Sequence, residues 1–85
     1  MIQFDFTVTD PDGLHARPAG QLVKEAQQFK SSLSITKGEK TADLRRLFAV
    51  MGLAVKQNET VTIKAEGEDE QEAAAFIQKF LSDNF

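Results

Sequence analysis

Residues 2–19, IQFDFTVTDPDGLHARPA, contain a strand pattern, a turn signal and the start of a helical pattern, and this succession decides how the chain begins to fold. Apolar residues at positions 2, 4, 6 and 8 alternate with polar ones, which predicts a half-buried strand over 2–9. The segment 10–13, DPDG, interrupts this alternation with residues that favour turns. From residue 16 the apolar spacing becomes helical, and Pro18 falls in the first turn, where its missing N–H costs nothing.

The rest of the chain continues as short strand and helix patterns. We expect helices over 16–29, over 44–54 and from 69 onward, and further strands at 32–36, 40–42 and 60–67. Asp43 is the expected cap of the middle helix, and Asp69 with Glu72 the expected capping box of the last one. Strands with one apolar and one polar face need a cover on a single side. The predicted fold is therefore α+β, an open-faced two-layer β-sandwich of order βαββαβα, whose four-stranded antiparallel sheet is covered on one face by three helices.

Length and composition limit the functions that the chain can have. The 85 residues make a single domain, 1–85, with little room for an enclosed cofactor. There is no cysteine and only one histidine, which argues against disulfides and against zinc clusters of the usual kind. No apolar run approaches the ~20 residues of a membrane span, and the alternating N-terminus is unlike a signal peptide. We expect a cytoplasmic protein with no cofactor and no metal.

Charge is distributed unevenly along the chain. The net charge of −3 argues against a nucleic-acid-binding domain. Between residues 17 and 56 there are eight basic and three acidic residues, whereas from residue 57 onward there are seven acidic residues and two lysines. The basic part directly follows the single histidine, and it suits an acidic partner surface or a phosphoryl group.

His15, the only histidine, immediately precedes the predicted first helix. A helix start has unpaired N–H groups and the positive end of the helix dipole, and both favour a phosphate group. An imidazole there can act as a nucleophile while the surrounding amides hold the anion that it receives. Arg17 adds a guanidinium suited to phosphate oxygens. In the competing interpretation, Asp12-Gly13 is an ordinary hairpin turn and His15 a surface or cap residue.

The predicted middle helix has apolar residues around its whole circumference. They are Leu44, Leu47, Phe48, Val50, Met51, Leu53 and Val55. A surface helix buries a stripe of roughly 100°, so we expect part of this set to face water. Together with the preceding Arg45 and Arg46, the exposed part indicates a protein contact site. The alternative is a helix enclosed on all sides, which few domains of this size can build.

Three segments together resemble one known family: 13–19 (GLHARPA), Leu47-Phe48 with Met51, and 65–70 (AEGEDE). The family is HPr, the histidine-containing phosphocarriers of the bacterial phosphoenolpyruvate-dependent sugar phosphotransferase system, and the resemblance covers essentially the whole chain. It implies that His15 accepts a phosphoryl group on Nδ1 from phosphorylated enzyme I and passes it to a sugar-specific enzyme IIA. The amides of Ala16 and Arg17 would then steady the phosphate. Such a protein is a carrier without independent turnover, not an enzyme.

The resemblance also implies where the partners bind. The positions at which HPr proteins meet both enzyme I and enzyme IIA correspond here to Gly20, Gln21, Lys24, Leu47, Phe48 and Met51. We add Arg45, which stands beside this group in the sequence. One patch serves two partners in turn, so the contacts are expected to be transient and the carrier a monomer.

Two residues depart from the family pattern. Arg46 stands where many HPr proteins have a regulatory serine that a kinase phosphorylates, so we expect this chain to escape that control. Asp12 stands where several relatives have a neutral hydrogen-bonding side chain. Its carboxylate should repel a phosphohistidine, and Asp12→Asn is expected to prolong the lifetime of the phosphorylated state.

Two other functions fit the same residues. The chain could be a regulatory HPr-like module that reports phosphorylation state to a target protein, or a domain that binds a phosphate ester without covalent chemistry. The combination of His15 and Arg17 favours a phosphocarrier or a regulatory module over a domain that only binds a phosphate ester. The absence of the regulatory serine favours transport over regulation.

Overall fold

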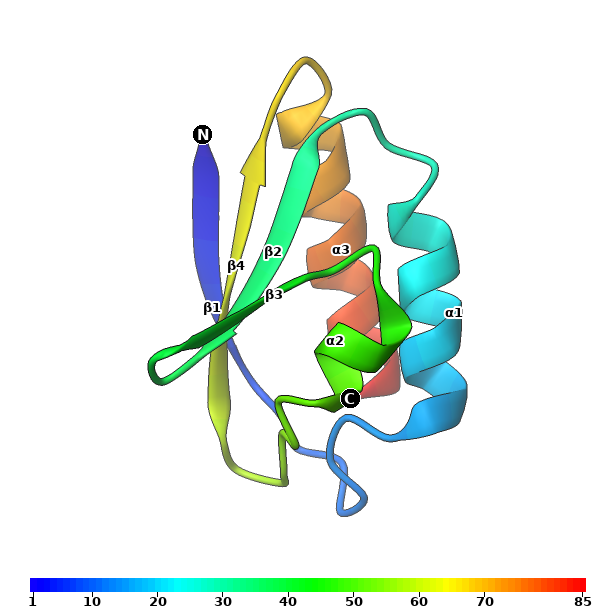
Figure 1. Cartoon of the computed structure of the whole chain (residues 1–85), viewed down its shortest axis with the longest axis vertical. Coiled ribbons are helices and arrows are strands. Elements are labelled where there is room, and N and C mark those ends of the chain that lie inside the picture. The colour runs from blue at the N-terminus through cyan, green and yellow to red at the C-terminus, as the bar shows by residue number, and fades with distance from the viewer.

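The computed structural model describes all 85 residues and contains one sheet of four strands (Figure 1). The strands are β1 (Ile2–Thr7), β2 (Ser32–Lys37), β3 (Lys40–Asp43) and β4 (Thr60–Glu66). They pair antiparallel in the order β1-β4-β2-β3, so the first strand lies beside the last. At the centre of the sheet, Ile63 of β4 pairs with Phe4 on one side and with Ile35 on the other. Three apolar residues therefore form one row across three strands.

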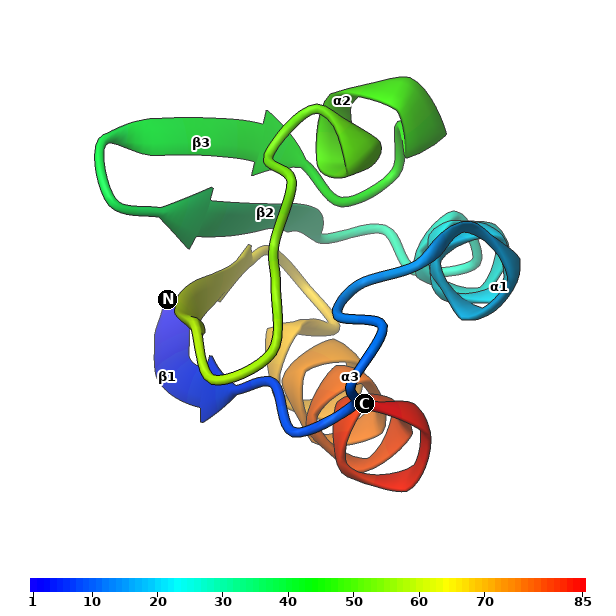
Figure 2. The ribbon, with the colours of Figure 1, turned by 90° about the horizontal axis from the view of Figure 1, so that it is seen from below.

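Three helices form the second layer. They are α1 (Ala16–Ala26), α2 (Leu47–Met51) and α3 (Glu70–Asn84), and all three lie on the same side of the sheet (Figure 2). The element order is βαββαβα, which confirms the predicted open-faced two-layer α+β fold. None of the three helices combines the length and the apolar character that a membrane crossing requires.

The core lies between the sheet and the helices. Leu22 of α1 and Ile77 of α3 are completely shielded from water, as are Ile35 and Ile63 on the sheet. Burying a side chain of this size stabilises the fold by roughly 1.5–3 kcal/mol. Phe80, three residues after Ile77 on the same helix, is only partly buried and packs at the margin of the core.

The first helix is shorter than predicted. Its apolar stripe extends to Phe29, but α1 ends at Ala26. The N–H groups of Gln28 and Phe29 donate to the carbonyls of Glu25 and Ala26, three residues back, at 3.1 and 3.3 Å. This tighter spacing ends the α-helix and turns the chain toward β2.

The middle helix is also shorter, and its predicted cap is wrong. α2 begins at Leu47, with Arg46 at the N-cap position, and it ends at Met51. Asp43 instead stabilises a turn before the helix. Its Oδ1 accepts from the Arg45 N–H at 2.9 Å and its carbonyl accepts from the Arg46 N–H at 3.0 Å. Three residues therefore separate the residue expected to cap the helix from its first turn.

The predicted capping box of the last helix is wrong as well. Asp69 occupies the N-cap position of α3 but makes no side-chain cap bond. Its two carboxylate oxygens accept from the N–H groups of Lys30 and Ser31, both at 2.9 Å, so Asp69 ties α3 to the segment that follows α1. The acid that folds back is Glu70, which accepts from the Gly67 N–H at 3.1 Å. The Asp69 carboxylate therefore accepts hydrogen bonds from residues far away in the sequence and not from the first turn of its own helix.

Candidate functional site

The segment before His15 forms a tight turn. The Gly13 N–H donates to the Asp10 carbonyl at 2.9 Å, and the Asp12 N–H donates to Asp10 Oδ1 at 2.8 Å. Gly13 has φ +66°, a conformation that side chains with Cβ rarely adopt. A Cβ at Gly13 would collide with the Val55 carbonyl oxygen and lie 2.9 Å from Lys56 Cα. The turn therefore depends on a glycine for two separate reasons.

Leu14 anchors this turn in the core and so brings His15 to the surface beside it. The Leu14 side chain is buried, and its N–H donates to the Val55 carbonyl at 3.0 Å. His15 follows as the N-cap residue of α1 in an extended conformation, with φ −87° and ψ 166°. Its side chain remains 37% exposed. The sequence prediction that the histidine stands at a helix start and at the surface is confirmed.

Lys37 holds the segment against which Leu14 rests. Its ammonium donates to the carbonyls of Leu53 and Ala54 at 3.1 and 3.0 Å and pairs with Glu59 at 3.0 Å. The hydrogen bond from Lys37, followed by the one from the Lys56 N–H, lowers the pKa of Glu59 from its ordinary value of 4.5. The backbone on both sides of Val55 is thus fixed by charge-assisted hydrogen bonds.

The start of α1 presents unpaired N–H groups. The first N–H of this helix that has a backbone acceptor is that of Ala19, which donates to the His15 carbonyl at 3.0 Å. The N–H groups of Ala16 and Arg17 have no acceptor within the protein, and Pro18 has no N–H. The Arg17 side chain is exposed and makes neither an ion pair nor a hydrogen bond. Two amides and one guanidinium beside His15 are therefore free to bind an anion.

The two ring nitrogens of His15 have different surroundings. Nε2 lies 3.3 Å from Asp10 Oδ2, whereas Nδ1 has no hydrogen-bond partner. A carboxylate accepts and does not donate, so a neutral ring in this position carries its hydrogen on Nε2 and the lone pair on Nδ1. Asp12 is the acid expected near the histidine from the sequence, whereas the contact of Asp10 with the ring was not predicted. The available signal was the turn itself, because an aspartate at the first position of a turn commonly accepts from the backbone two residues on.

Asp10, Asp12 and His15 are also the one group of side chains whose ligand atoms gather as a metal site would require. One atom from each lies within 4.8 Å of the others. The nearest pair of these groups forms the hydrogen bond between Nε2 and Asp10, which already occupies the ring nitrogen facing the carboxylates. We assign no cation to this group.

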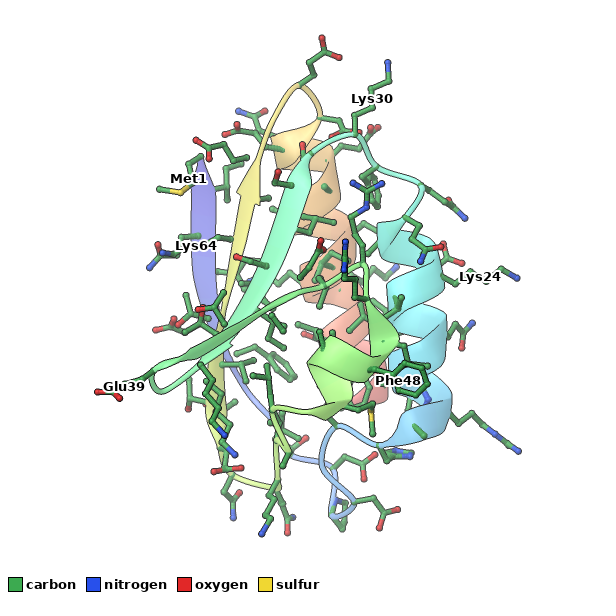
Figure 3. The ribbon with its side chains drawn as sticks, viewed as in Figure 1. Met1, Lys24, Lys30, Glu39, Phe48 and Lys64 are labelled. Carbon is green, nitrogen blue, oxygen red and sulfur yellow. The ribbon has the colours of Figure 1, made fainter.

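The residues predicted to bind partners lie on α1 and α2, which stand side by side, except Arg45, which lies in the turn before α2 (Figures 1 and 2). Those with exposed side chains are Gln21, Lys24 and Phe48, while Gly20, Arg45, Leu47 and Met51 are partly exposed. Phe48 is 90% exposed and projects from α2 (Figure 3). The expectation that part of the middle helix faces water is confirmed. Within α2 only Val50 is buried, and the apolar residues just outside the helix, Leu44, Leu53 and Val55, are buried as well.

Comparison with known proteins identifies the family. Residues 2–83 match the family model described as the phosphotransferase system HPr component phosphorylation site. The phosphocarrier protein HPr of Lysinibacillus sphaericus is 46% identical over 78 residues, which cover 92% of this chain and 89% of that protein. A structure of the histidine-containing phosphocarrier protein of Mycoplasma has a TM-score of 0.93 and 39% identity, covering 96% of this chain and 93% of the other. Crh, the Bacillus subtilis catabolite repression HPr, has a TM-score of 0.65 and 36% identity over 94% of this chain and 95% of its own. A turn that presents one histidine at an open helix start thus occurs in a chain that matches these proteins over nearly its full length, and the chain belongs to the HPr family of phosphocarrier proteins of the phosphotransferase system.

Proposed function

We propose that His15 accepts a phosphoryl group on Nδ1 from phosphorylated enzyme I and passes it to a sugar-specific enzyme IIA. The observation that supports this role most strongly is that the two ring nitrogens of His15 have different surroundings. Nε2 faces the Asp10 carboxylate, and Nδ1 is free at the start of α1, beside the unpaired amides of Ala16 and Arg17. A nucleophile and an anion-binding site therefore lie within one short segment.

The proposed chemistry needs no proton transfer at the attacking atom. The Nδ1 lone pair attacks phosphorus, the new N–P bond forms, and the bond between phosphorus and the donor enzyme breaks. The ring gains positive charge while its Nε2–H remains hydrogen-bonded to Asp10, and this carboxylate stabilises the charge that develops. Transfer to the second partner is the same displacement in reverse, with Nδ1 as the leaving group.

The phosphoryl group brings negative charge to the start of α1, where hydrogen-bond donors and a cation can bind it. The N–H groups of Ala16 and Arg17 can donate to phosphoryl oxygens, and the free Arg17 guanidinium can neutralise them. The site is shallow, since His15 is 37% exposed. A shallow site suits a carrier because each partner protein excludes water only while it is bound.

We propose that both partners dock on one patch, the partner patch, made of Gly20, Gln21, Lys24, Arg45, Leu47, Phe48 and Met51. Phe48 is 90% exposed although it is a large apolar side chain; Arg45 and Arg46 directly precede its helix, and Lys24 lies on the neighbouring α1. An exposed aromatic group with a polar margin is the usual anatomy of a transient protein interface. Met51 is a flexible side chain that can adapt to two different surfaces. We place the carrier in the cytoplasm as a monomer, which leaves this patch free for each partner in turn.

The decisive assay combines the protein with enzyme I and phosphoenolpyruvate. We expect intact mass measurement to show one phosphate, lost on brief acid treatment as expected for a phosphoramidate. His15→Ala should take up none, and its circular dichroism should match that of the unsubstituted protein. A phosphate that persists on His15→Ala, or one that survives acid, would contradict the assignment.

A regulatory role is the second candidate, and the similarity to Crh supports it. Regulation through a phosphoserine is unsuited to this chain, because Arg46 occupies the expected position and no serine or threonine occurs between residues 42 and 59. The Arg46 side chain is exposed, 3.9 Å from Asp43, at the start of α2. We expect incubation with an HPr serine kinase to add no phosphate; an acid-stable increase in mass would contradict this.

A further inference from the structure

Phe85, the last residue of the sequence, packs against the candidate site from the opposite end of the chain. The C-terminal end of α3 lies beside the loop that leads into α1 (Figures 1 and 2). The Phe85 side chain is only 4% exposed. Its ring centre lies 6.0 Å from that of His15, and the two rings are inclined at 76°, an edge-on aromatic contact. The imidazole thus contacts the Asp10 carboxylate at Nε2 and the Phe85 ring in an edge-on arrangement.

The Phe85 main chain contacts the same loop. Its oxygen accepts from the Thr9 N–H at 2.6 Å, from the Asp10 N–H at 2.8 Å and from the Thr9 hydroxyl at 2.9 Å. Asp10 is the residue whose carboxylate faces His15 Nε2. One residue therefore contacts the imidazole directly through its ring and indirectly through the backbone of its hydrogen-bond partner.

We propose that Phe85 is a positioning residue for phosphoryl transfer. The ring limits rotation of the imidazole, and the main-chain oxygen fixes Asp10, so that Nδ1 points away from the protein and toward an incoming phosphorus atom. The transfer step in this inference rests on the proposed function of His15, whereas the orientation of the ring does not. Aromatic pairs in this geometry are favourable beyond their buried area, which biases the imidazole toward one side-chain rotamer.

Three changes separate the two contacts. Phe85→Ala removes the ring and keeps the main-chain oxygen. Phe85→Leu also removes the aromatic contact but fills much of the volume, so it remains informative if the alanine variant unfolds. A chain that ends at residue 84 removes the ring and the oxygen together. Phe76→Ala is the matched control, because Phe76 is a phenylalanine within α3 whose ring pairs only with Phe29 and Phe80.

The first readout is independent of phosphorylation. NMR of the His15 ring, with ¹⁵N-labelled histidine, reports how the ring hydrogen is shared between Nδ1 and Nε2. We expect Phe85→Leu to shift the ring-proton resonances through loss of the aromatic contact. The chain that ends at residue 84 should in addition lose the preference for hydrogen on Nε2. Phe76→Ala should leave both properties as they are. Ring-proton resonances unchanged in Phe85→Leu would refute the contact itself.

The second readout separates positioning from docking in the assay with enzyme I and phosphoenolpyruvate. For Phe85→Leu we expect kcat to fall on the order of tenfold, with KM changed less than about twofold, because orientation is lost while the partner patch is intact. A wild-type kcat in Phe85→Leu would overturn the positioning role even if the contact is present. If the unsubstituted protein takes up no phosphate, the proposed function fails, and the NMR result still decides whether Phe85 orients the ring.

Discussion

At the scale of single residues, the two nitrogens of the His15 imidazole have different surroundings. Asp10 accepts at Nε2 and leaves the lone pair on Nδ1. Asp12 stands in the same turn but contacts Asp10 through its backbone N–H rather than through its carboxylate. The two acids therefore have different expected roles. Asp10 orients the ring and stabilises its positive charge, while Asp12 only adds negative charge near the phosphoryl group.

Substitution of each acid by its amide tests this difference. In Asp10→Asn the new amide can donate to Nε2 and so favour hydrogen on Nδ1, and we expect the rate of phosphorylation by enzyme I to fall roughly 10- to 100-fold. Asp12→Asn is the matched control for charge. We expect it to keep a near-normal rate and to lengthen the half-life of the phosphohistidine, because a repulsive carboxylate is gone. Equal effects of the two changes on the rate, or a shorter half-life for Asp12→Asn, would argue against these roles.

At the scale of elements, the turn between β1 and α1 fits only because Gly13 has no side chain. The combination of φ +66° and close contact with the Val55 carbonyl makes Gly13→Ala doubly unfavourable. We expect a loss of about 1–3 kcal/mol in the free energy of unfolding, measured with urea, together with slower phosphorylation of His15. Gly20→Ala is the control for stability alone, since a Cβ at Gly20 meets no atom within 4 Å and its helix would gain propensity, whereas its place in the partner patch excludes it from the comparison of phosphorylation rates. Full stability and activity in Gly13→Ala would contradict the dependence of the site on this turn.

The junction of α3 with the end of α1 should make stability depend on pH. Hydrogen bonds from the Ser31 hydroxyl, which has the largest effect, and from the Lys30 and Ser31 N–H groups lower the pKa of Asp69 from its ordinary value of 3.8. The folded state therefore binds this proton less readily than the unfolded chain does. The stabilisation is complete above pH 3.8 and is lost as the pH falls through the lowered pKa. We expect the difference in unfolding free energy between the wild type and Asp69→Asn to be constant above pH 3.8 and to shrink below it. A difference that stays the same throughout the acidic range would refute the linkage.

At the scale of the whole molecule, the open helix start and the exposed surface of α2 make one side of the helical layer suited to a partner. Phe48 carries little of the stability because it is 90% exposed. For Phe48→Ala we expect a change in unfolding free energy within about 0.5 kcal/mol. We expect the KM of enzyme I for the carrier to rise roughly tenfold at nearly constant kcat. Phe76→Ala, which removes a phenylalanine from α3, should leave KM unchanged, and an equal rise in both variants would contradict a specific patch on α1 and α2.

The parts of the fold that follow from local pattern could be predicted from the sequence. The alternation in 2–8 and the helical spacing of Leu22 and Ile77 depend only on near neighbours, and they predicted the elements and the layer order. The same is true of His15 at the helix start. Predictions failed where a side chain bonds residues far away in the sequence. Asp69 accepts from Lys30 and Ser31 instead of capping its own helix. Phe85 was missed for the same reason, since its contact with His15 joins the two ends of the chain.

The proposed acceptor of the phosphoryl group is the Nδ1 atom of His15. The protein contains one histidine, so ¹⁵N NMR of the histidine-labelled chain, recorded after incubation with enzyme I and phosphoenolpyruvate, reports on a single ring. We expect coupling to phosphorus at Nδ1, with hydrogen retained on Nε2. Phosphorus on Nε2, or a phosphorylated protein whose histidine signals are unchanged, would contradict phosphorylation of His15 at Nδ1.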